Sequence, residues 1–183
     1  MKQTNSERIR SLAVAGLVAG LYTALTVVLA PLSFGTVQCR VAEALTVLAA
    51  YSPASAVGLT VGCALSNLIG LTMGANVAGA LDILLGTLAT GAAAWLSYLL
   101  RRFRVGGLPV WSTLPPVVLN ALIIGSELTV AVGPRHLNGW LLWVGSVGAG
   151  QLVACVGGGL LLAMAFKKSG FDHRLEQNNY TFR

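Results

Sequence analysis

The chain has 183 residues, of which 55% are hydrophobic and 10% are charged, and its formal net charge is +6. This composition is too apolar for a soluble domain, and several stretches are long enough to cross a bilayer as helices. Those stretches are continuously apolar, which excludes the alternating pattern of a β-barrel and predicts an all-α membrane protein.

Six transmembrane helices are predicted. The first covers residues 11–30 and ends at Pro31, because proline cannot continue a helix. No soluble domain interrupts the series, so the chain is predicted to be a single integral membrane domain with a short cytoplasmic tail. The remaining spans are placed at residues 40–51, 53–69, 78–100, 117–132 and 139–166, and the tail at 167–183.

The basic residues predict the orientation of the bundle. Of the 12 lysines and arginines, all except Arg40 and Arg135 lie before the first span, between the fourth and fifth spans, or after the last. Placing these three segments in the cytoplasm satisfies the positive-inside rule and puts both termini inside. The same distribution argues against nucleic-acid binding as the reason for the positive charge.

Small residues recur at helical spacing in the first span. Two patterns overlap there, Ala15 with Ala19 and Gly16 with Gly20. Small residues four positions apart allow a second helix to approach closely. The spacing leaves open whether that partner is another helix of the bundle or a separate subunit.

Charged residues gather in the predicted outer half of the bundle. Arg40 and Glu43 are three positions apart and so share one helix face, and Asp82 and Glu127 also lie inside predicted spans. Intramembrane carboxylates usually face a cavity or a partner, and one arginine does not neutralise three acids. We therefore expect an outward-facing pocket for a polar or cationic solute. The alternative is an internal ion-pair network in which Arg40 neutralises Glu43 or Asp82 without a ligand.

Neutral side chains complete the predicted pocket. Gln38, Asn67 and Asn120 offer hydrogen bonds, although Asn120 suits a helix–helix contact equally well, and Phe34 lies in a loop where it would cover a planar ligand. The chain has no phosphate-binding loop, no HExxH and no cluster of His and Cys with metal-ligand spacing. It is therefore predicted not to be an enzyme and to need no metal or cofactor, so any ATPase would come from other chains.

A set of residues distributed over essentially all six spans forms a recognisable combination. Its members are Ser33, Phe34, Gly35, Gln38, Arg40, residues 43–48 (EALTVL), Asn67, residues 82–90 (DILLGTLAT), Asn120, Ala121, Gly125, Glu127 and Leu128. Taken together, these residues resemble the QueT family, whose proteins are substrate-binding (S) components of energy-coupling factor transporters. The resemblance implies uptake of a queuosine precursor, a 7-deazaguanine such as its 7-aminomethyl form or queuine.

The resemblance also implies partners and a location. It implies a multi-pass protein of a prokaryotic plasma membrane that associates with a transmembrane coupling subunit and two ATPase subunits. In related S components the small residues of the first helix meet the coupling subunit, and Ala15 and Ala19 are the matching positions here. The bundle is then expected to topple within the membrane to release its substrate inward.

The implied ligand suits the polar residues. A guanine-like edge offers N–H donors to a carboxylate and an oxygen acceptor to arginine or an amide. We expect Glu43 and Asp82 to be the main acceptors, with Glu127 as a third candidate and Arg40 either orienting Glu43 or donating to the ring oxygen. Gln38, Asn67 and Asn120 would supply neutral contacts.

Other functions fit the same composition. The nearest is an S component for another vitamin or base. A proton-coupled secondary transporter of a cationic solute would use the carboxylates as proton sites, although no inverted repeat is evident. A non-transport assembly subunit would only pair its acids with Arg40, and an intramembrane enzyme is the least favoured because no catalytic set is present.

Overall fold

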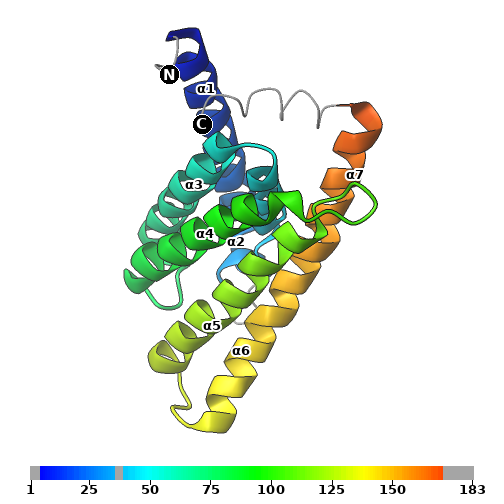
Figure 1. Ribbon diagram of the computed structural model, residues 1–183. Coiled ribbons are helices and arrows are strands. Elements are labelled where there is room, and N and C mark those ends of the chain that lie inside the picture. Colours follow the sequence, from blue (N-terminus) through cyan, green and yellow to red (C-terminus); the bar gives the residue numbers. More distant parts are fainter. Residues whose placement is uncertain (1–4, 36–38, 171–183) are drawn as a thin grey trace.

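Helices make up all the regular structure in residues 5–35 and 39–170, the parts of the chain that the computed structural model describes (Figure 1). Apolar side chains dominate these helices and bury one side of each against its neighbours. In chain order the elements are α1 (Asn5–Val28), α2 (Ala30–Ser33), the 3₁₀ helix η1 (Val41–Ala50), α3 (Pro53–Thr72), α4 (Leu81–Leu99), the 3₁₀ turns η2 (Leu100–Arg102) and η3 (Val110–Thr113), α5 (Leu114–Ala131), α6 (Leu137–Gln151), the π-helical segment η4 (Leu152–Gly158) and α7 (Gly159–Ser169).

Five helical segments in the described part of the chain are long and apolar enough to cross a membrane. This finding confirms the prediction of an all-α, multi-pass membrane protein. They correspond to the first, third, fourth, fifth and sixth predicted spans, with ends shifted by several residues. Neighbours in sequence pack as neighbours in space, from α3 through α4 and α5 to α6 (Figure 1). The five segments are Asn5–Val28, Pro53–Thr72, Leu81–Arg102, Val110–Ala131 and Leu137–Ser169.

The second predicted span differs from the expectation of an ordinary α-helix. Residues Val41–Ala50 form a 3₁₀ helix of ten residues, which at a rise of about 2.0 Å per residue is about 20 Å long. It lies among α1, α3, α4, η4 and α7, and most of its residues are buried. Because side chains three positions apart eclipse one another in a 3₁₀ helix, Glu43 and Thr46 lie on the side that begins at Arg40.

Glycines in α3 set how closely α1 approaches. A Cβ at Gly58 would lie 2.5 Å from the carbonyl oxygen of Ala15, and one at Gly62 would lie 2.9 Å from that of Ala19. The Ala15 and Ala19 face of α1 is therefore occupied by a helix of the same chain. Gly16 and Gly20, by contrast, have nothing within 4 Å of a Cβ, so their face is open.

The last long helix changes its winding in the middle. Leu137–Ser169 runs as one rod in which η4 is π-helical, and Figure 1 shows α6 and α7 as its two ends. The wider winding coincides with close packing on η1, since a Cβ at Gly158 would lie 3.0 Å from that of Ala44. The two unusual helices therefore face each other at the centre of the bundle, beside Glu43.

Candidate functional site

Glu43 is held at the centre of the bundle by hydroxyl groups from two long helices. Its Oε1 accepts hydrogen bonds from the Tyr22 hydroxyl of α1 at 2.5 Å and from Thr90 Oγ1 of α4 at 2.9 Å. The residue is only 1% exposed, and its Oε2 has no partner among the described residues. One carboxylate oxygen therefore orients the side chain while the other keeps its full capacity to accept.

Arg40 precedes η1 and reaches across to α3. Its Nη1 donates to Cys63 Sγ at 3.5 Å and its Nη2 to Asn67 Oδ1 at 3.2 Å. The guanidinium also lies 5.3 Å from the centre of the Phe34 ring, a cation–π contact. These contacts differ from the direct pairing with Glu43 or Asp82 considered from the sequence. Arg40 is instead held by neutral groups, which leaves its positive charge available to the site.

Asn67 connects the arginine to the start of α4. Its Nδ2 donates to the backbone oxygen of Asp82 at 2.7 Å, while its Oδ1 accepts from Arg40. A Cβ at Gly86 would lie 2.6 Å from Asn67 Nδ2, so glycine is needed there to admit the amide. Asp82 lies in the first turn of α4 and its Oδ2 accepts from the backbone N–H of Ala78 at 3.3 Å. A carboxylate is favoured at this end of a helix by the helix dipole.

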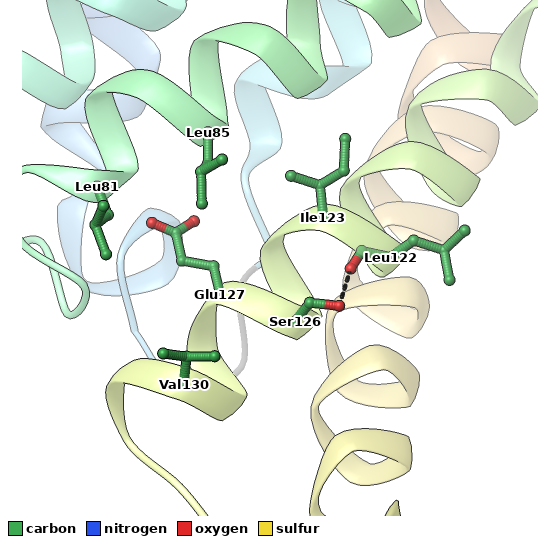
Figure 2. A pocket seen from close by; sticks show the side chains of 7 residues that line it. All are labelled: Leu81, Leu85, Leu122, Ile123, Ser126, Glu127 and Val130. Atoms are coloured by element: carbon green, nitrogen blue, oxygen red, sulfur yellow. Dashed lines mark hydrogen bonds between the residues drawn. The ribbon is translucent and has the colours of Figure 1, made fainter. Parts of the chain in front are cut away.

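Glu127 of α5 has a different environment. It is 4% exposed, and neither carboxylate oxygen has a hydrogen-bond partner in the described structure. The side chain borders a cavity of about 460 Å³ between α4 and α5, which is open at the surface of the bundle where Leu81, Leu122 and Val130 are exposed. Figure 2 shows its carboxylate pointing toward α4, between Leu81 and Leu85. The other residues lining the cavity are Leu122, Ile123, Ser126 and Val130.

Electrostatic interactions connect Arg40 with the three buried carboxylates of the site. The charge of Arg40 acts on Asp82 and on Glu127, and the charges of Asp82 and Glu127 act on each other. Arg40 also lies close enough to Glu43 for their charges to interact. Three carboxylates therefore share the field of one guanidinium, and the cluster carries an excess of negative charge if all of them are ionised.

The structure places most of the predicted site residues near one another. Arg40 contacts both Asn67 and Phe34, and Asn67 is hydrogen-bonded to the backbone oxygen of Asp82. Glu43 follows Arg40 on η1. Asn120 is buried on α5 with its Nδ2 unpartnered among the described residues. Gln38 lies outside the described residues, and Ala15 with Ala19 packs inside the bundle rather than on its open face.

Sequence reasoning missed three members of this network, namely Tyr22, Cys63 and Thr90. Tyr22 is fully buried, and a buried tyrosine hydroxyl usually has a hydrogen-bond partner, so a tyrosine in the middle of an apolar span was the available signal. Cys63 lies in an apolar span, where a free cysteine usually packs as a small hydrophobic residue, and a thiol that accepts from arginine has no sequence signature. Thr90 lies about two helical turns after Asp82 on α4 but carries no distinctive signal by itself.

Comparison with known proteins identifies the family to which the chain belongs. No curated protein and no solved structure matches the chain. The sequence profile described as "QueT transporter" matches residues 12–168, which extend from within α1 to within α7, and this match confirms the resemblance drawn from the sequence. The chain therefore belongs to the QueT transporter family.

Proposed function

We propose that this protein is the substrate-binding component of an ATP-driven energy-coupling factor importer and that it captures a queuosine precursor, a 7-deazaguanine, from outside the cell. The observation that carries this proposal is the oriented carboxylate of Glu43, which keeps one free oxygen close to a buried arginine. Family membership supports transport, and the chemistry of the cluster supports a guanine-like ligand.

The contacts fit the edge of a guanine-type ring. Its adjacent N–H donors match a carboxylate acceptor, and the free Oε2 of Glu43 offers one. Arg40 has five N–H donors, of which two are engaged by Cys63 and Asn67, so others remain for a ring oxygen. The Phe34 ring beside the guanidinium supplies an aromatic surface for a planar base. In a buried site these groups would reject bases that leave them unpaired.

The architecture of the importer follows the same proposal. The chain would form a single membrane domain that crosses the membrane six times and has both termini in the cytoplasm. The 3₁₀ helix η1 would be the short second crossing. It would lie in the plasma membrane of a prokaryote and associate with a coupling subunit and two ATPases. The open Gly16 and Gly20 face of α1 would then meet the coupling subunit, while Ala15 and Ala19 hold α1 on α3.

Calorimetric titration of the purified chain tests the proposal. We expect saturable binding of 7-aminomethyl-7-deazaguanine and queuine, weaker binding of guanine, which shares the same ring edge, and no binding of thiamine at the same concentrations. The variant Glu43→Gln should weaken deazapurine binding about 10- to 100-fold, because a hydrogen bond to a charged group is lost. Glu7→Gln, which removes a carboxylate in the exposed first turn of α1, is the matched control and should bind as the unmodified chain does. Equal affinity in both variants would remove Glu43 from the site.

A second candidate is a proton-coupled secondary transporter of a cationic solute, favoured by the unpartnered carboxylate of Glu127. It predicts uptake into proteoliposomes that contain this chain alone and that stops when the proton gradient is removed. The importer predicts no uptake without the coupling subunit and the ATPases. A single uptake assay, run with and without the coupling subunit and the ATPases, therefore distinguishes the secondary transporter from the importer.

A further inference from the structure

Glu127 is the least compensated charged group in the described part of the bundle. Both of its oxygens are buried and neither has a partner among the described residues. Burial of a carboxylate without hydrogen bonds is unfavourable, and an intramembrane acid usually marks a cavity or a partner. The hydroxyl groups that orient Glu43 have no counterpart here, so Glu127 is available for a group that enters from outside the chain.

The nearby cations do not satisfy Glu127. Arg40 makes its hydrogen bonds to Cys63 and Asn67 on α3 and makes none to Glu127. Arg135, the other arginine predicted to lie on the outer side, is exposed and donates through Nε and Nη2 to the backbone oxygen of Val130. The excess negative charge of the cluster therefore lies on the α4–α5 side, where a positively charged ligand group would be attracted.

The cavity beside Glu127 limits the kind of cation that fits. Its walls are mainly leucine, isoleucine and valine side chains. The one hydroxyl group, that of Ser126, is already engaged, because it donates to the Leu122 oxygen at 2.6 Å and accepts from Trp140 Nε1 at 2.9 Å. Calcium and magnesium need six or more oxygen ligands, and no group of three metal-binding side chains occurs in the described residues. A single carboxylate between apolar walls instead suits an organic ammonium group on a short hydrocarbon stem.

Resting on the proposed function, we infer that Glu127 is the counter-ion of an ammonium group on the 7-substituent of the ligand. Glu43 and Arg40 recognise the ring, and Glu127 recognises the substituent in the cavity between α4 and α5 (Figure 2). The Glu127 carboxylate lies between Leu81 and Leu85, which flank Asp82 on α4 (Figure 2). The backbone oxygen of Asp82 is hydrogen-bonded to Asn67, which in turn accepts from Arg40, so Glu127 borders the end of the network that holds the ring-binding arginine. Glu127 thereby selects cationic over neutral 7-substituted deazaguanines.

A pair of ligands with the same ring tests this inference. The full-length chain and its variants are titrated with 7-aminomethyl-7-deazaguanine, which is a cation, and with 7-cyano-7-deazaguanine, which is neutral. We expect Glu127→Gln to weaken binding of the aminomethyl ligand about 10- to 100-fold while binding of the cyano ligand changes less than about twofold. Glu127→Asp, which keeps the charge, should retain most of the preference for the cation. Glu43→Gln should weaken both ligands alike.

Controls separate this role from a structural one. Ser126→Ala changes the wall of the same cavity without changing its charge and should leave the ratio of the two affinities unaltered. Thermal unfolding in detergent reports whether each variant is folded. Equal weakening of both ligands by Glu127→Gln, or no effect on either, overturns the inference while leaving the proposed function in place. Failure of the unmodified chain to bind either ligand would instead reject the proposed function, and the inference with it.

Discussion

Two carboxylates, Glu43 and Glu127, lie in the same bundle and are buried to a similar extent, yet their surroundings differ. Glu43 accepts hydrogen bonds from Tyr22 and Thr90 and lies among packed helices. Glu127 has no partner in the described structure and borders a cavity with apolar walls. One carboxylate is oriented before any ligand arrives, and the other is left to be satisfied.

This difference separates affinity from selectivity. A preoriented acceptor loses little conformational freedom when a ligand binds, so it favours tight recognition of the group that all ligands share. A buried charge without a partner strengthens the binding only of a ligand that carries the opposite charge, so it discriminates among substituents. The contrast predicts that variants on the η1 side change folding and ring recognition, whereas variants on the α4–α5 side change selectivity.

The largest effect is expected at Arg40, which supports the η1 side. Arg40→Ala leaves the Asn67 oxygen without its donor and removes the positive charge shared by the buried acids. Loss of one member of a buried charged cluster typically lowers the free energy of unfolding by about 3–5 kcal/mol. We therefore expect a much lower thermal unfolding midpoint in detergent and no measurable deazapurine binding.

Arg135→Ala is the matched control, because it removes an exposed arginine predicted to lie on the same side of the membrane. Its effect on the free energy of unfolding should stay within about 0.5 kcal/mol, as is usual for surface substitutions. Similar midpoints for the Arg40 and Arg135 variants would mean that Arg40 does not stabilise the centre of the bundle.

Tyr22 and Thr90 test how Glu43 is oriented. Each donates to the same carboxylate oxygen, and a hydrogen bond to a charged group contributes about 1.5–3 kcal/mol. Tyr22→Phe and Thr90→Val should each lower stability and weaken binding of both deazaguanines equally. The double variant should lose more than the sum of the two, because only then does Oε1 have no donor. Strict additivity, measured by a double-mutant cycle on binding free energy, would show that the two hydroxyl groups act independently.

The two faces of α1 provide the next comparison. Gly58→Val on α3 places a side chain against the backbone of Ala15, and overpacking of this kind costs about 1–3 kcal/mol. Gly16→Val makes the same change on the open face and should leave the unfolding midpoint nearly unchanged. If the open face meets the coupling subunit, only Gly16→Val should yield a folded protein that fails to copurify with that subunit. Equal unfolding midpoints for the two variants would contradict the α1–α3 packing.

Part of this arrangement could be predicted from the sequence. Intramembrane charges are rare, so Arg40, Glu43, Asp82 and Glu127 stood out, and long apolar runs predicted all five of the long helical segments in the described residues. The 3₁₀ form of Val41–Ala50 could not be predicted, because apolar residues in a short segment have the same pattern in either helix type. The hydrogen bond from Tyr22 to Glu43 could not be predicted either, because the two residues are 21 positions apart and only the packing of α1 on η1 brings them together.

The smallest expected effect is on the stability of the ligand-free protein, where the same substitution, Glu→Gln, should change the free energy of unfolding in opposite directions at the two carboxylates. Glu127→Gln removes a buried charge that has no partner, so the ligand-free protein should gain about 1 kcal/mol of unfolding free energy; the gain is limited because the amide is also unsatisfied. Glu43→Gln removes a charge that two hydroxyl groups stabilise, so the ligand-free protein should lose stability by a similar amount. Opposite shifts of the thermal midpoint, measured in one detergent and at one pH, are expected. A loss of stability in both variants would mean that Glu127 has a partner that stabilises its charge in the empty protein, and the cavity would then not be a site left open for a cation.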